Sequence, residues 1–109
     1  MKALIVDDVK ANRAMLTSQL KSGGHKVLEA ADGVEALKMV GLEKIDVIIS
    51  DILMPNMDGY SLCRTLRKGQ NYKNIPFIFY SSSHTSLGDK KRRWIWAETA
   101  LLKSQQPRM

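Results

Sequence analysis

Three aspartates follow apolar runs, and their carboxylates could do metal or phosphoryl chemistry. Asp7 and Asp8 come directly after Ala3–Val6, and Asp51 follows the run Asp46–Ser50. Short continuous apolar runs are typical of strands that are buried on both faces of a parallel sheet. Because parallel strands end at the same edge of a sheet, we expect the three carboxylates to converge there. Hard oxygen donors in such a cluster favour Mg²⁺, whose charge would relieve their mutual repulsion.

A carboxylate beside a bound cation can also act as a nucleophile. It can attack a phosphoryl group and form a mixed anhydride, while the cation offsets the charge that builds up during transfer. Asp51 is therefore the candidate phosphoryl acceptor, and Asp7 and Asp8 are candidate ligands of Mg²⁺. The pair Asp7 and Asp8 taken alone would fit a surface turn equally well.

The elements that must position these side chains alternate along the chain. Strands are predicted over residues 3–6, 25–30, 46–50 and 76–80. Between them, the helical spacing of apolar residues predicts helices over residues 11–21, 34–40 and 60–66. The first helix would bury the apolar stripe Ala11, Ala14, Met15 and Leu20. This order predicts an α/β fold with a sheet of parallel strands and right-handed crossovers.

Composition bounds the classes of protein to consider. With 109 residues and 44% hydrophobic content, we expect one domain over residues 1–109. No apolar leader or membrane-length apolar stretch is visible, so we expect a soluble, cytoplasmic protein without a membrane partner. The single cysteine, Cys63, cannot form an internal disulfide, which fits a reducing compartment.

The net charge of +6 raises the question of a nucleic-acid partner. Much of the excess lies in one run, Lys90–Arg93, with no recognition motif nearby. We interpret this run as a solvated helix face and expect no nucleic-acid partner. A basic nucleic-acid module over Lys90–Trp96 is the competing interpretation, and it would show salt-dependent binding.

Three segments of the chain resemble the receiver domain of response regulators, which has the CheY-like fold. They are Leu4–Asp8, Asp51–Gly59 and Ile75–Ser81, and the middle one carries the specific pattern acid-x-x-Met-Pro-x-Met-Asp-Gly. The resemblance covers residues 1–85. It implies a flavodoxin-like, doubly wound parallel sheet with strand order 2-1-3-4-5 and a function in two-component signal transduction.

The resemblance also implies roles for individual residues. Asp51 would accept a phosphoryl group from a histidine kinase or relay protein, and Asp7 and Asp8 would hold Mg²⁺ together with the backbone carbonyl of Leu53. Ser81 would supply a switch hydroxyl that bonds the phosphoryl oxygens, unless it is merely a serine in a polar loop. The protein would then change its surface for an unknown downstream partner, and it would not be an enzyme.

The tail departs from the family pattern. A complete receiver has a fifth strand that ends in Lys-Pro and a fifth helix, but Trp94 and Trp96 stand where a turn is expected. The fifth strand has no clear counterpart in residues 90–109, and the fifth helix is missing. Reading one base earlier near Arg92 permits residues like those of the missing strand, so we hypothesise a frameshift that sequencing the gene would test. Exposed tryptophans would favour self-association.

Lys103 has two interpretations. It could end a makeshift fifth strand after Ala100–Leu102 and contact the phosphoryl group, or it could face solvent in a ragged terminus. The sequence favours neither.

Two further functions compete with the signalling switch. An aspartyl-phosphate phosphatase would use the same carboxylates and Mg²⁺. It would also need a second acid shortly after Asp51, where Leu53 stands. A non-functional relic would keep the fold while a frameshifted tail uncouples phosphorylation from any partner.

Overall fold

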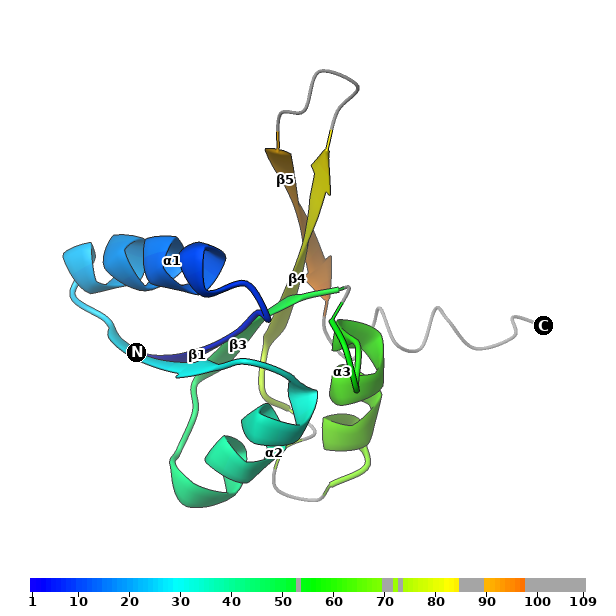
Figure 1. The fold of residues 1–109 in the computed structure, drawn as a ribbon. Coiled ribbons are helices and arrows are strands. Elements are labelled where there is room, and N and C mark those ends of the chain that lie inside the picture. The colour runs from blue at the N-terminus through cyan, green and yellow to red at the C-terminus, as the bar shows by residue number, and fades with distance from the viewer. Residues whose placement is uncertain (53, 70–71, 73, 85–89, 98–109) are drawn as a thin grey trace.

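The computed structural model describes the backbone of residues 1–52, 54–69, 72, 74–84 and 90–97, and the side chains among these up to residue 80. The elements are β1 Lys2–Val6, α1 Lys10–Ser22, β2 Lys26–Ala30, α2 Gly33–Leu42, β3 Val47–Asp51, α3 Gly59–Arg67, β4 Phe77–His84 and β5 Lys90–Ala97. The predicted alternation of strands and helices up to β4 is therefore confirmed (Figure 1).

The strands form one sheet in the order β2-β1-β3-β4-β5. Strand β1 pairs with β2 and β3, and β3 pairs with β4, all in parallel, which confirms the predicted parallel sheet over these strands. In the register Val6 lies opposite Ser50, and Asp51 lies opposite Tyr80. Asp7 follows Val6 as Asp51 follows Ser50, so the two aspartates come at the same level of one sheet edge.

The helices cover both faces of the sheet, with α1 on one face and α2 and α3 on the other (Figure 1). Side chains of a strand point alternately to the two faces, so β1 supplies both cores. The core on the α1 side consists of Ala3, Ile5, Leu16, Val47, Ile49 and Tyr80. The core under α2 and α3 consists of Leu4, Val6, Ala30, Ala36, Val40, Ile45, Ile48, Leu62, Cys63, Leu66, Phe77 and Phe79. Continuous apolar runs in β1 and β3 follow from this double burial.

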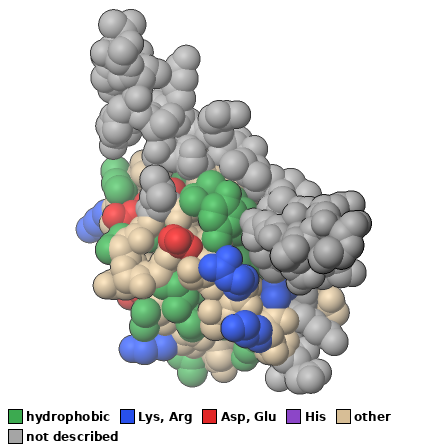
Figure 2. Space-filling model, turned by 90° about the vertical axis from the view of Figure 1, so that its right-hand side faces the viewer, with side chains coloured by type: hydrophobic (Ala, Val, Ile, Leu, Met, Phe, Trp, Pro, Cys, Tyr) green, Lys and Arg blue, Asp and Glu red, His purple; other side chains and the backbone are tan. Residues whose placement is uncertain are grey.

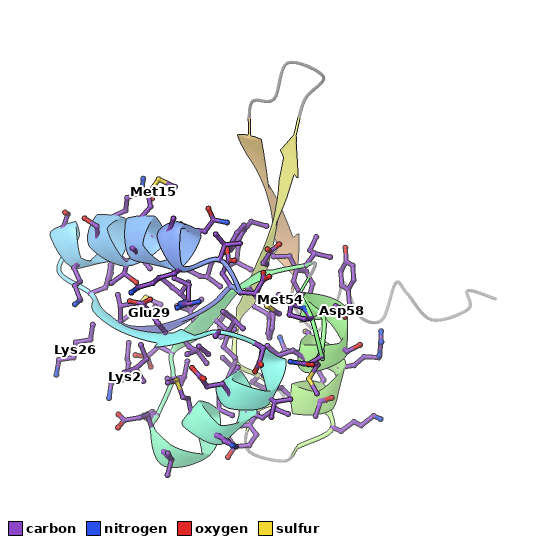
Figure 3. All side chains as sticks on the ribbon, in the orientation of Figure 1. Lys2, Met15, Lys26, Glu29, Met54 and Asp58 are labelled. Carbon is purple, nitrogen blue, oxygen red and sulfur yellow. The ribbon has the colours of Figure 1, made fainter. Side chains whose placement is uncertain are left out.

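Helix α1 buries a different stripe from the predicted one. Its buried residues are Asn12, Leu16 and Thr17, whereas Met15 is 44% exposed and points away from the sheet in Figure 3. The predicted alanines are not buried either. The prediction is confirmed for Leu20, which is half-buried against the core of the α1 side, and is wrong for Met15 and the two alanines, because Leu16, four residues before Leu20, faces the strands instead.

Two helices begin at an aspartate whose side chain caps the first turn. Asp32 precedes α2 and accepts a hydrogen bond from the Glu35 amide at 2.9 Å. Asp58 precedes α3 and accepts one from the Ser61 amide at 2.7 Å. Each carboxylate satisfies a backbone donor that the helix itself cannot satisfy, and so sets where the helix begins.

The fifth strand differs from expectation in direction and in residues. β5 pairs antiparallel with β4, from Phe77 opposite Ala97 to His84 opposite Lys90. The basic run at its start is therefore strand, and the predicted helix face was wrong. Only residues 85–89 separate the two strands, and so short a connection can join antiparallel neighbours but not parallel ones. In Figure 1 the far ends of both strands extend beyond the rest of the sheet.

Helix α3 is amphipathic. Its inner face is buried and consists of Gly59, Leu62, Cys63 and Leu66. Its outer face carries Arg64, and Lys68 follows at its end, both exposed. Figure 2 views the molecule from the side of α3 and shows Lys and Arg side chains on this surface. Among the described residues, no helix is long and apolar enough to cross a bilayer.

We expect Leu62→Ala to destabilise the fold far more than Leu42→Ala. Leu62 is fully buried, so its truncation leaves a cavity and should lower the free energy of unfolding by about 2–5 kcal/mol. Leu42 is 82% exposed at the end of α2, and the same change there should cost less than about 0.5 kcal/mol. Urea denaturation of both variants measures the difference. Equal losses would contradict the packing of α3 on the sheet.

Candidate functional site

Three carboxylates meet at the carboxyl edge of the sheet, as the sequence predicts. Asp7, Asp8 and Asp51 each offer an oxygen atom, and these atoms lie within 4.8 Å of one another. Asp7 is 0% exposed and Asp51 is 5% exposed, whereas Asp8 faces solvent. The cluster is thus open on one side, where a ligand could reach it.

Asp7 is held in place through both its side chain and its backbone. Its Oδ1 accepts from the Val9 amide at 2.8 Å, and its Oδ2 accepts from the Tyr80 hydroxyl. Its amide donates to the Ala30 carbonyl at 3.1 Å, and its carbonyl accepts from Arg13 Nη1 at 2.7 Å. Hydrogen bonds therefore connect Asp7 to the end of β2, to β4 and to α1 as well as to its own loop.

Asp51 is positioned by the end of β3. Its backbone lies opposite Tyr80, and the next amide, that of Ile52, donates to the Tyr80 carbonyl at 3.0 Å. The Ser50 hydroxyl donates to the Asp51 carbonyl at 2.8 Å inside the protein. These bonds keep the acceptor candidate attached to a rigid strand.

A glycine brings the start of α3 against the backbone of the acceptor candidate. The Gly59 amide donates to the Ile52 carbonyl at 2.9 Å, and a Cβ at Gly59 would lie 2.4 Å from the Asp51 carbonyl oxygen. Only a residue without a side chain permits this approach. In Figure 3, Met54 and Asp58 mark the segment that joins β3 to α3.

The same segment is braced against α2. Asn56 has a φ of 70°, a left-handed conformation that asparagine tolerates better than most residues. Its side-chain amide donates to Asp32 Oδ2 at 3.2 Å. The hydrogen bond from the Glu35 amide, aided by the one from Asn56, holds the pKa of the Asp32 carboxyl below its usual value. Sequence reasoning missed this brace, although the turn-forming Asn and Asp types were a signal for it.

The donor set fits a hard divalent cation. All three side chains in the cluster are carboxylates, and two of them are buried, where like charges repel strongly. Arg13 lies near the cluster, but its Nε pairs with Oε1 of Glu29 at 3.2 Å, so its positive charge is shared with an acid outside the cluster. Oxygen-only ligands with one open side suit Mg²⁺, which keeps several of its waters.

The other predicted site residues are described only in part or not at all. Ser81 was expected in a polar stretch beyond the strand, but β4 continues through it to His84 and pairs Ser81 with Arg93. The continuation follows from the pairing with β5, which extends the ladder past the end of β3. Leu53, Lys103 and the makeshift strand expected before Lys103 lie outside the described residues.

Comparisons with known proteins agree with this geometry. The family described as response regulator receiver domain matches residues 3–107. The chain is 42% identical over 88 residues to a probable transcriptional regulator ycf27 of Guillardia theta, covering 81% of the chain and 32% of that protein. It is 46% identical over 93 residues to the sensor histidine kinase RcsC of Escherichia coli strain K12, covering 85% of the chain and 9% of that protein. The chain thus spans a third or less of these relatives.

Solved structures show the same likeness. A receiver domain of a signal transduction histidine kinase from Syntrophus aciditrophicus superposes with a TM-score of 0.72 at 34% identity, covering 80% of this chain and 66% of that one. The chemotaxis response regulator CheY4 of Vibrio cholerae superposes with a TM-score of 0.67 at 41% identity, covering 70% of this chain and 63% of that one.

We expect Gly59→Ala to destabilise the protein and Gly41→Ala to stabilise it. The added methyl group at Gly59 would collide with the Asp51 carbonyl and push α3 away from the site. Gly41 lies within α2 with open space around it, so alanine there should add about 0.5–1 kcal/mol by restricting the unfolded chain. Thermal unfolding compares the two. A neutral Gly59→Ala would mean that the close approach is not required.

The cap of α2 should make stability depend on pH. The pKa of Asp32 is lowered in the folded protein, so its charge contributes stability above the ordinary value of 3.8, and this contribution is lost as the pH falls through the folded value. Asparagine keeps a capping oxygen but does not titrate. The advantage of the wild type over Asp32→Asn should therefore be steady near neutral pH and should shrink as the pH is lowered from about 6 to below the ordinary value of 3.8. A difference in unfolding free energy that stays constant over this range would contradict the charged cap.

Proposed function

This chain belongs to the response regulator receiver domain family, and we propose that it accepts a phosphoryl group on Asp51 in two-component signal transduction. The observation that carries the proposal is the cluster of Asp7, Asp8 and Asp51, whose oxygens lie within 4.8 Å at the carboxyl edge of the sheet. Ligands of open parallel sheets bind at this edge. A surface turn does not account for Asp7, because its carboxylate is buried.

The cluster would hold Mg²⁺. Asp7, Asp8 and Asp51 would be its side-chain ligands, and the backbone carbonyl of Leu53 is our candidate for the remaining protein ligand. When bound, the cation would offset the charge that develops on the phosphoryl oxygens. The hydrogen bonds to both oxygens of Asp7 support this function, since ligand carboxylates need partners that orient them.

Asp51 would carry out the transfer itself. One of its carboxylate oxygens attacks the phosphorus of a phosphohistidine, the P–N bond breaks, and the imidazole leaves with its electron pair and takes up a proton. The result is a mixed anhydride on Asp51. The buried backbone bonds around residues 50–52 hold the nucleophile at the end of β3 during this step.

Ser81 is our candidate for the switch hydroxyl. Its backbone directly follows Tyr80, which lies opposite Asp51, so Ser81 comes just beyond the level of the acceptor. A hydroxyl that gains a charge-assisted bond only when Asp51 is phosphorylated would stabilise that state selectively. Lys103 is the remaining candidate for a contact with the phosphoryl group.

The partners follow from the same assignment. A relative named a sensor histidine kinase supports a histidine kinase or relay protein as the phosphoryl donor. The receiver would pass its state to a downstream protein through a changed surface, without an enzymatic reaction on a substrate of its own. We also propose a cytoplasmic location. Burial raises the pKa of the Cys63 thiol, so this cysteine is a poor nucleophile and plays no part in the transfer.

Intact mass after incubation with Mg²⁺ and acetyl phosphate tests the acceptor. We expect the wild type to gain one phosphoryl group and Asp51→Asn to gain none, because an amide is not a nucleophile of this kind. Asp46→Asn is the matched control, since Asp46 is exposed at the opposite edge of the sheet, and it should be phosphorylated like the wild type. Omission of Mg²⁺ should greatly reduce the gain. A folded wild-type protein without any gain would make a non-functional relic the better description.

A further inference from the structure

Tyr80 makes a contact that the proposed transfer reaction does not use. It is fully buried in β4, and its ring lies in the core on the α1 side. Its hydroxyl donates to Oδ2 of Asp7. The two residues are far apart in the sequence and come from strands that are not neighbours, because β3 lies between β1 and β4. The tyrosine therefore reaches across β3 to the acidic cluster.

The packing of the ring does not explain the hydroxyl of Tyr80, whereas the hydrogen-bonding requirement of the buried Asp7 carboxylate does. The ring lies in the core on the α1 side among apolar side chains such as Ile5 and Leu16, which pack against a ring but offer a hydroxyl no hydrogen-bond partner. A buried carboxylate is costly unless donors satisfy it. Asp7 has one donor from its own loop, the Val9 amide on Oδ1, and the Tyr80 hydroxyl serves the other oxygen. One donor on each oxygen fixes the plane of the Asp7 carboxylate.

We propose that Tyr80 is a positioning residue for the metal site: its hydroxyl fixes the Asp7 carboxylate in the orientation that a divalent cation requires. The inference rests on the proposed Mg²⁺ site and adds a residue outside the cluster to it. Without the hydroxyl, the Asp7 side chain keeps only the Val9 amide among the donors described above and gains rotational freedom. Part of the binding free energy of the cation is then lost to the entropy cost of ordering the Asp7 side chain, so the affinity falls.

Mg²⁺ binding measured without any phosphoryl donor tests this role. Calorimetric titration should show Mg²⁺ binding about tenfold more weakly to Tyr80→Phe than to the wild type, the size typical of a lost partner of a metal ligand. Tyr72→Phe is the matched control. Tyr72 is half-buried and lines a cavity with Val40 and Ile45, away from the acidic cluster, and this variant should bind like the wild type. Far-UV circular dichroism checks that both variants are folded.

A second readout uses the wild type and does not depend on the folding of a variant at Tyr80. The chain has three tyrosines, so 3-fluorotyrosine labelling gives three fluorine signals, and those of Tyr60 and Tyr72 are identified with their own Phe variants. Mg²⁺ should shift the signal of Tyr80 and leave that of Tyr72 in place.

The outcomes separate the two proposals. If the wild type binds no Mg²⁺, the proposed metal site itself fails. If the wild type binds Mg²⁺ but Tyr80→Phe binds it with the same or higher affinity, or the Tyr80 signal does not respond, only the positioning role is overturned. Weaker binding in Tyr80→Phe alone, with a responding Tyr80 signal, is the result that we expect.

Discussion

Two carboxylates are buried at the same end of the sheet, and burying them costs free energy. Much of the structure around that end offsets this cost. Asp7 and Asp51 are both buried, and a third acid, Asp8, lies within reach of the same point. Charges so placed repel one another strongly when water is excluded. Hydrogen-bond donors satisfy both oxygens of Asp7, and the cluster is open on one side, where the proposed cation would offset the negative charge.

The scaffold that holds these charges is built mainly from backbone hydrogen bonds. The parallel register sets Asp7 and Asp51 at one level, because Val6 lies opposite Ser50. The segment after β3 is then held by Gly59, whose backbone lies against that of Asp51, and by Asn56, whose side chain donates to Asp32, the cap of α2.

Strand β4 connects the acidic cluster to the outer part of the sheet. Its first half pairs parallel with β3, and it continues beyond the end of β3 paired antiparallel with β5. Tyr80 and Ser81 stand where the one pairing ends and only the other continues. A change at the acidic cluster that moves either residue would therefore act on the strand that leads out of the sheet.

The sequence by itself determined the order of the elements, the parallel sheet and the three acids at its edge, because apolar runs, turn residues and the acids that end the strands are local patterns. Only the tertiary structure decided that Leu16 rather than Met15 faces the core, that β5 runs antiparallel, and that Asn56 and Tyr80 reach Asp32 and Asp7. The helix stripe was misjudged because several rotations of α1 bury some apolar surface, and the strands beneath select among them. The side-chain contacts join residues far apart in the sequence, and such pairs come within bonding distance only after the strands have taken their places and the register is set.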